Sequence, residues 1–230
     1  MAKIRALLFD LDNTLVDFMK MKQAAVRAAI EAMVDAGLDL SPTDASRRIW
    51  SIYDEEGIES QQVFDRFLTE HYGSINYKVL AAGIIAYRRA REAAMVLYPH
   101  VKSTLVELVR RGYRLAVLSD APAKQAWLRL CALDLHHFFE TVVTFEDTGE
   151  RKPHPRPFQK VLAALSVTAA ESLMIGDWPD RDMAGAKAVG IRTVFARYGD
   201  TLNLLQSGAD REIDDISELL TLLENPNFNQ

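Results

Sequence analysis

Residues 4–15 read IRALLFDLDNTL, and this stretch decides how the rest of the chain is interpreted. The mainly apolar run from Ile4 to Phe9 stops at Asp10, which is typical of a strand that is buried on both faces and ends in a loop. Asp10 and Asp12 lie two residues apart, and in continuing extended backbone such residues point to the same side. Both carboxylates could therefore face one pocket, although loop acids that cap a turn give the same pattern.

A different pattern runs from Phe18 to about Ala94, where apolar residues recur at helical spacing. Ser41, Pro42 and Asp44 supply an N-cap, a first-turn proline and an acidic third residue, so a helix is expected to begin there. The other helices of this stretch are expected at 19–36, 59–71 and 76–94.

After Pro99 the chain alternates between helix and strand. Strands are expected at 113–119, 140–145, 172–176 and 192–196, and helices at 100–111, 122–133, 155–166 and 180–189, with a single turn at 168–171. Strands that alternate with crossover helices predict an α/β fold, a Rossmann-like parallel sheet with helices on both faces. Ligands of such sheets bind at the carboxyl ends of the strands.

Composition and charge narrow the class of protein. The chain has 230 residues, of which 49% are hydrophobic and 26% charged, as expected for a globular protein with one full domain and a smaller insert. The net charge of -5 disfavours nucleic acid and acidic membranes as partners, and no apolar run is long enough to span a membrane. The single cysteine, Cys131, is expected to pack on a helix as a small hydrophobe, and we expect a cytoplasmic protein.

Further polar residues stand where other predicted strands end. Ser119 and Asp120 follow one strand, Asp177 follows another, and Lys152 lies in the loop GERKPHP. Phosphoryl transfer needs such groups: a carboxylate to attack phosphorus, a divalent cation, and donors for the phosphoryl oxygens. Carboxylates without a histidine or cysteine cluster suit Mg²⁺ better than zinc.

The order of these segments, FDLDNTL, LSD, KPHP and GDWPDRD, resembles the haloacid dehalogenase superfamily over residues 4 to about 198. The resemblance implies that Asp10 is the nucleophile and a magnesium ligand, and that it forms an aspartyl phosphate. It implies that Asp12 protonates the leaving oxygen, later deprotonates water, and binds the metal through its backbone carbonyl.

The later motifs carry the remaining expected roles. Ser119 would donate to a phosphoryl oxygen, with Asp120 beside it in substrate binding, and Lys152 would neutralise charge on both the nucleophile and the phosphoryl group. Asp177 would complete the metal site. Asp182 is favoured over Asp180 as the second acid of the last motif, because it directly precedes the small-residue stretch MAGAKAVG.

The helical stretch resembles the α-helical cap that one branch of the superfamily inserts after the first motif. The expected domains are a catalytic core of residues 1–16 and 99–230 and a cap of residues 17–98, which would close over the site and select the substrate. The resemblance implies a magnesium-dependent phosphatase of a small phosphorylated metabolite, either a monomer or a homodimer. The basic run of Arg88, Arg89 and Arg91 is read as a solvated helical face.

Competing functions remain open at this point. A haloacid dehalogenase would not need Asp12, since halide leaves without protonation, but a phosphomutase of the β-phosphoglucomutase type keeps the same acid pair. A signalling receiver domain also gathers aspartates and a lysine at a sheet edge, but its phosphorylated aspartate lies on a later strand. A non-catalytic phosphate-binding protein would have little reason to keep Asp10, Asp12, Lys152 and Asp177 together.

Overall fold

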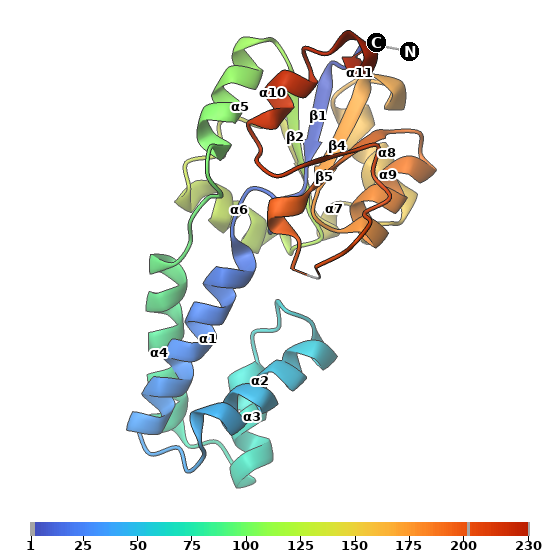
Figure 1. Ribbon diagram of the computed structural model, residues 1–230. Helices are drawn as coiled ribbons and strands as arrows, with labels where there is room; N and C mark the ends of the chain where they lie inside the picture. Colours follow the sequence, from blue (N-terminus) through green and yellow to red (C-terminus); the bar gives the residue numbers. More distant parts are fainter. Residues whose placement is uncertain (1–2, 202, 230) are drawn as a thin grey trace. The chain divides into compact units, whose positions relative to one another are not determined.

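The computed structural model describes residues 3–201 and 203–229. The chain forms two compact units, which are described separately below (Figure 1). The core unit comprises Met1–Asp17 and Val96–Gln230, and the helical unit comprises Phe18–Met95.

The core unit is built on a parallel sheet of six strands, β1 (Ala6–Phe9), β2 (Arg114–Leu118), β3 (Thr141–Val143), β4 (Ser172–Gly176), β5 (Arg192–Ala196) and β6 (Arg211–Ile213). The strand order is β3-β2-β1-β4-β5-β6, and every neighbouring pair is parallel. β1 therefore lies inside the sheet, and all four of its residues are buried, as its apolar sequence predicts.

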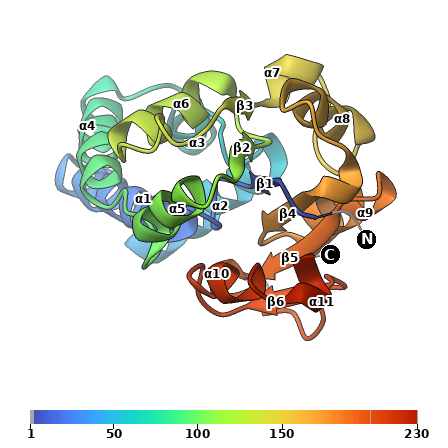
Figure 2. The same cartoon turned by 90° about the horizontal axis from the view of Figure 1, so that it is seen from above.

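Helices cover both faces of this sheet. They are α5 (Val101–Arg110), α6 (Ala123–Ala132), α7 (Phe145–Thr148), α8 (Pro155–Ala164), α9 (Ala184–Ala188), α10 (Glu218–Leu222) and α11 (Pro226–Asn229). Figure 2 shows α7, α8 and α9 on one side of the strands and α5, α6 and α10 on the other. On the α8 side, Leu8, Phe158 and Phe195 belong to one buried apolar cluster. The predicted α/β class, a parallel sheet with helices on both faces, is confirmed.

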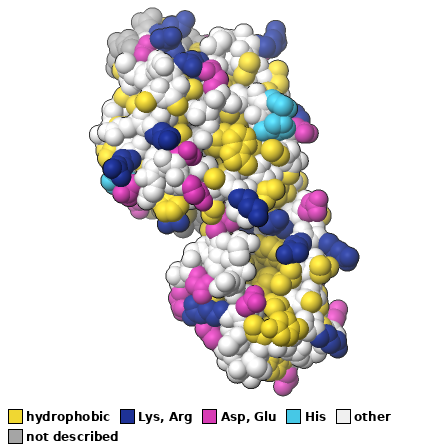
Figure 3. All heavy atoms as spheres, turned by 180° about the vertical axis from the view of Figure 1, so that it is seen from behind, with side chains coloured by type: hydrophobic (Ala, Val, Ile, Leu, Met, Phe, Trp, Pro, Cys, Tyr) yellow, Lys and Arg dark blue, Asp and Glu magenta, His cyan; other side chains and the backbone are white. Residues whose placement is uncertain are grey.

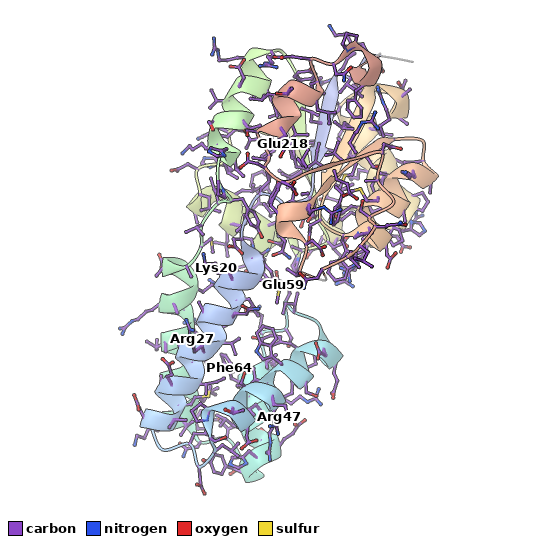
Figure 4. The ribbon with its side chains drawn as sticks, in the orientation of Figure 1. Lys20, Arg27, Arg47, Glu59, Phe64 and Glu218 are labelled. Carbon is purple, nitrogen blue, oxygen red and sulfur yellow. The ribbon has the colours of Figure 1, made fainter. Side chains whose placement is uncertain are left out.

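The helical unit consists of α1 (Phe18–Asp35), α2 (Pro42–Glu56), α3 (Val63–Tyr72) and α4 (Tyr77–Ala93). Ser41 caps α2 as its sequence indicates, because its hydroxyl oxygen accepts a hydrogen bond from the Asp44 amide at 3.1 Å. Figure 4 labels Phe64 on α3, which is buried in the apolar cluster of this unit and meets the Tyr87 ring edge-on at 5.5 Å. The four helices therefore share a core of their own.

A buried lysine joins three parts of the helical unit. Lys22 on α1 is only 3% exposed, and its ammonium donates to the Ile58 carbonyl at 2.8 Å and to the Tyr87 hydroxyl at 2.9 Å. The same ammonium lies 4.0 Å from the centre of the Tyr53 ring. A desolvated cation over an aromatic face is a favourable contact, so Lys22 ties the loop after α2 to α1 and α4.

The two joints between the units lie side by side at the edge of the core unit. Val16 and Leu97 form an antiparallel bridge, and the Asp17 amide donates to the Val96 carbonyl at 3.1 Å. The boundaries expected from the sequence lie between residues 16 and 17 and between residues 98 and 99. In the structure, the units divide between residues 17 and 18 and between residues 95 and 96.

Several local features differ from expectation. The helix expected at 180–189 is a wide π-type turn, Pro179–Met183, followed by the short helix α9, and β6 is an edge strand of three residues that was not expected. Cys131 is exposed, so the expectation that it packs as a small hydrophobe was wrong; it lies on the solvent side of α6.

The surface carries charged side chains of both signs, as the composition predicts. Figure 3 shows acidic and basic side chains intermingled over the face that it presents. Among the residues that the structure describes, no helix has the length and apolar character needed to cross a membrane.

Candidate active site

The predicted site residues follow neighbouring strands at one edge of the sheet. Asp10 comes directly after β1, Ser119 after β2 and Asp177 after β4. Phe9 pairs in register with Val117 of β2 and with Ile175 of β4, so the chains leave the sheet at nearly the same level. The Asp10 amide extends this pairing by donating to the Ile175 carbonyl at 2.8 Å.

Lys152 is the centre of the site. Its buried ammonium lies 2.5 Å from an Asp10 carboxylate oxygen and 2.6 Å from one of Asp182, and it donates to the Leu118 carbonyl at 2.9 Å. The backbone amide of Lys152 donates to Asp120 at 2.9 Å. The lysine is thus held at both ends, and a fixed cation of this kind can stabilise charge that develops on a phosphoryl group.

Three buried carboxylates lie together at this point, and two of them, Asp10 and Asp182, contact Lys152. Asp10, Asp177 and Asp182 each offer an oxygen, and the three oxygens lie within 4.8 Å of one another. The ammonium contacts only two of these three acids among the ion pairs described, and desolvated carboxylate oxygens of this kind fit a hard divalent cation such as Mg²⁺. The residues present therefore fit the metal that the sequence predicts.

Burial determines the protonation behaviour of these groups. It raises the pKa of Asp10 above its ordinary value against the opposing Lys152 charge, and it raises the pKa of Asp177 further. It also raises the pKa of Asp182 to about 7. Burial lowers the pKa of Lys152, but the negative charges of Asp10 and Asp182 raise it by more. The pKa of the ammonium therefore lies above its ordinary value. Lys152 therefore stays protonated.

The last motif turns Asp182 inward and leaves Asp180 outside. Asp182 is 1% exposed, whereas Asp180 is exposed to solvent. The Trp178 amide donates to the Asp182 carboxylate at 3.1 Å across the π-type turn. A β-carbon on Gly176 would lie 2.3 Å from an Asp182 carboxylate oxygen, so this position has room only for glycine.

Asp12 stands apart from the buried carboxylates. Its side chain is 21% exposed and lies 3.3 Å from the guanidinium of Arg129, which is itself only 5% exposed. Arg129 projects from α6, a helix to which the sequence analysis assigned no site residue. A buried cation beside the expected proton-transfer group can fix the direction in which that carboxylate points.

Ser119 and Asp120 complete the edge. Ser119 is buried, and its hydroxyl oxygen accepts from the Ala121 amide at 3.2 Å. Asp120 binds the Lys152 backbone through one oxygen and lies 3.6 Å from Arg181 through the other. These two contacts fix the position of Asp120, and its expected part in substrate binding stays a prediction.

Sequence reasoning also gave no role to Thr14. This residue is fully buried, and its hydroxyl donates to Asp177 at 3.2 Å. Thr14 lies in the quoted segment FDLDNTL, four residues after Asp10, so its closeness to the nucleophile was the available signal.

Comparison with known proteins assigns the family. The model of the haloacid dehalogenase-like hydrolases matches residues 7–196, which include every predicted site residue. The chain belongs to this family. It is 36% identical over 227 residues to a glyceraldehyde 3-phosphate phosphatase of Pyrococcus abyssi, covering 97% of this chain and 95% of the relative.

Other relatives of this haloacid dehalogenase-like hydrolase are also similar over nearly the full length. A ribulose-1,5-bisphosphate 5-phosphatase of Halopiger xanaduensis is 32% identical over 237 residues, covering 95% of this chain and 98% of the relative. The crystal structure of a phosphatase of the same superfamily from Thermococcus onnurineus has a TM-score of 0.70 at 27% identity, covering 96% of this chain and 98% of that one.

Proposed function

We propose that this haloacid dehalogenase-like hydrolase is a phosphatase that cleaves the phosphate ester of a small metabolite through a covalent intermediate on Asp10. The observation that carries the proposal is the buried cluster of Asp10, Asp177 and Asp182 at the carboxyl edge of the sheet, with the Lys152 ammonium in contact with Asp10 and Asp182. Relatives named as phosphatases support the same reaction class.

The first step forms the intermediate. A carboxylate oxygen of Asp10 attacks phosphorus while the bond from phosphorus to the ester oxygen breaks, and the departing oxygen takes a proton from Asp12. Lys152 lies 2.5 Å from the attacking carboxylate and offsets charge on the phosphoryl oxygens, and Ser119 donates to one of them.

The second step regenerates the enzyme. Asp12, now deprotonated, removes a proton from a water molecule that attacks phosphorus, and the bond between phosphorus and Asp10 breaks. Inorganic phosphate leaves, and both carboxyl groups return to their initial states. The Asp12 side chain is partly exposed and lies outside the buried carboxylate cluster, which supports this division of roles.

Asp10, Asp177, Asp182 and the Asp12 backbone carbonyl are the proposed holders of Mg²⁺. When bound, this ion screens the nucleophile from the negative phosphate and polarises the phosphoryl oxygens. Burial raises the pKa of all three carboxyls by more than the Lys152 charge lowers it, and a divalent cation would offset this cost of the buried anionic forms.

The proposed substrate class is a small sugar phosphate, with glyceraldehyde 3-phosphate as the first candidate. Five relatives from archaea that carry this name are 31–36% identical and cover 96–99% of this chain. The helical unit is proposed to select among esters, because the reacting groups named above all lie in the core unit.

The deciding experiment measures inorganic phosphate released from glyceraldehyde 3-phosphate, ribulose 1,5-bisphosphate, phosphoglycolate and phosphoserine, with Mg²⁺ and with EDTA. We expect turnover that requires the metal, and a loss of at least about 10⁴-fold in Asp10→Asn. Turnover by Asp10→Asn near the wild-type rate would refute the covalent mechanism. Transfer of phosphate between positions of one sugar, without release, would indicate the phosphomutase.

The last motif offers a matched pair of variants for the metal site. Asp182→Asn should weaken Mg²⁺ binding, measured by calorimetry, and should lower turnover by about 10²-fold or more. Asp180→Asn removes an exposed acid two residues away and should leave both quantities unchanged. Equal effects of the two substitutions would contradict the assignment of Asp182.

A further inference from the structure

The backbone turn that follows the candidate nucleophile is tightly folded. In this turn, residues 11–16, the Asn13 amide donates to the Val16 carbonyl at 2.7 Å, and the amides of Leu15 and Val16 both donate to Leu11, at 3.0 and 3.1 Å. Asn13 has a φ of 58°, in the left-handed region. Asp12 lies within this turn, so the path of its backbone sets where the Asp12 side chain and carbonyl point.

A second segment meets this turn from the far end of the sequence. It is the short helical turn Arg197–Gly199, which follows β5. A β-carbon on Gly199 would lie 1.7 Å from the carbonyl oxygen of Asn13, so the two backbones are in direct contact. The same β-carbon would lie 3.1 Å from the β-carbon of Asp177, which places Gly199 beside a proposed metal ligand as well.

Tyr198 makes an independent contact with the same turn. Its hydroxyl donates to the Thr14 carbonyl at 2.9 Å, and its ring meets the ring of Tyr98 edge-on at 4.9 Å. Thr14 in turn donates its own hydroxyl to Asp177 at 3.2 Å. Two successive carbonyl groups of the 11–16 turn are thus in contact with the second segment: that of Asn13 with Gly199, and that of Thr14 with Tyr198.

We propose that Tyr198 and Gly199 are positioning residues, which hold the 11–16 turn and so fix where Asp12 points and keep the Thr14 hydroxyl against Asp177. This inference rests on the proposed function for its kinetic part. A displacement of about 1 Å in a reacting group can cost about 10²-fold in rate, so a contact that fixes this turn affects the chemical step without touching the substrate.

Tyr198→Phe is the first test, because it removes one hydroxyl and keeps the ring against Tyr98. We expect kcat to fall by up to about tenfold, as for the loss of one partly buried hydrogen bond, while KM stays within about twofold. In metal-free protein, hydrogen exchange of the Asn13, Leu15 and Val16 amides should accelerate by about tenfold, with β1 amides unchanged.

Gly199→Ala is the second test, and Gly190→Ala is its control. The alanine at 199 must push the Asn13 carbonyl aside, so kcat should fall by about 10²-fold. Gly190 has a φ of 83° and nothing within 3.8 Å of an added β-carbon, so alanine there strains the backbone before β5 and should lower stability but leave kcat unchanged.

The outcomes separate this inference from the proposed function. Wild-type kcat and unchanged amide exchange in Tyr198→Phe would overturn the inference, whether or not Gly199→Ala folds. Equal losses of kcat in Gly199→Ala and Gly190→Ala, at equal loss of melting temperature, would also overturn it. Full activity of Asp10→Asn would refute the proposed mechanism, while faster exchange of the 11–16 amides would still support the contact.

Discussion

At the residue scale, the site depends on how one buried lysine is balanced by its neighbours. Lys152 alone would be costly to bury, but carboxylate oxygens of Asp10 and Asp182 lie 2.5 and 2.6 Å from its ammonium. The third acid, Asp177, has no such contact described with Lys152 and is instead bound by Thr14. The cluster is therefore acidic on balance, which makes its occupation by a divalent cation favourable.

Arg129 gives a prediction at this scale. Arg129→Met should lower turnover of alkyl phosphates by about tenfold or more, because Asp12 loses the cation that lies 3.3 Å from it, while p-nitrophenyl phosphate, whose leaving group needs no proton, should be affected less. Comparing the two rates measures the effect on proton transfer. The control is Arg110→Met, which removes an exposed arginine that pairs only with Glu107 among the ion pairs described. A uniform loss on both substrates would contradict the role.

Sequence reasoning found some of these residues and missed others for physical reasons. Asp10, Ser119 and Asp177 were brought together because parallel strands end at one edge, and each follows such a strand. Arg129 was missed because it lies in the last turn of α6, where the sequence does not show which side of the helix faces the site. The choice between Asp180 and Asp182 depended on a π-type turn that no helical pattern predicts, although π-type turns are frequent at functional sites.

At the element scale, capping signals predicted the helices better than periodicity did. Ser41 and the proline after it place the start of α2 correctly, and the turn at 168–171 has the capping box that its sequence indicates. The helix expected from residue 59 begins only at Val63, because Ser60 binds back to Glu56 and Gly57 in a turn instead. Local hydrogen bonds of this kind are invisible to apolar spacing.

Lys22 gives a prediction for the helical unit. Lys22→Met keeps the length of the side chain but removes the donor to Ile58 and Tyr87, so the unit should lose about 1–3 kcal/mol of stability. Urea unfolding followed by helical circular dichroism measures this loss. Lys78→Met, an exposed lysine on α4, is the matched control and should change stability by less than about 0.5 kcal/mol. Equal midpoints for both variants would contradict the role of Lys22.

At the scale of the whole molecule, each unit has a buried core of its own, and the chain passes between the units at two adjacent joints. The Asp17 amide and the Val96 carbonyl are hydrogen-bonded at 3.1 Å, beside the bridge between Val16 and Leu97. The core unit thus already contains the two sides of a hairpin, which a short loop can close.

This arrangement predicts that the helical unit can be removed. A shortened chain in which the dipeptide Asn-Gly replaces Phe18–Met95, between Asp17 and Val96, should fold and unfold cooperatively. The reason is that the removed segment is a separate compact unit. Calorimetry checks the fold. The substrate panel checks selectivity: if the helical unit chooses the ester, the shortened chain should hydrolyse the different phosphate esters at nearly equal rates. A core that melts without a cooperative transition would contradict the prediction.

The exposed cysteine on α6 has a practical consequence. Cys131 is the one cysteine in the sequence, it is open to solvent, and it lies two residues from Arg129 on the same helix. A thiol-reactive fluorophore or spin label would therefore attach at a single known point, without mutagenesis, on the helix that contacts Asp12. A label on Cys131 of the native chain can thus report, by spectroscopy in real time, on ligand binding at the candidate active site.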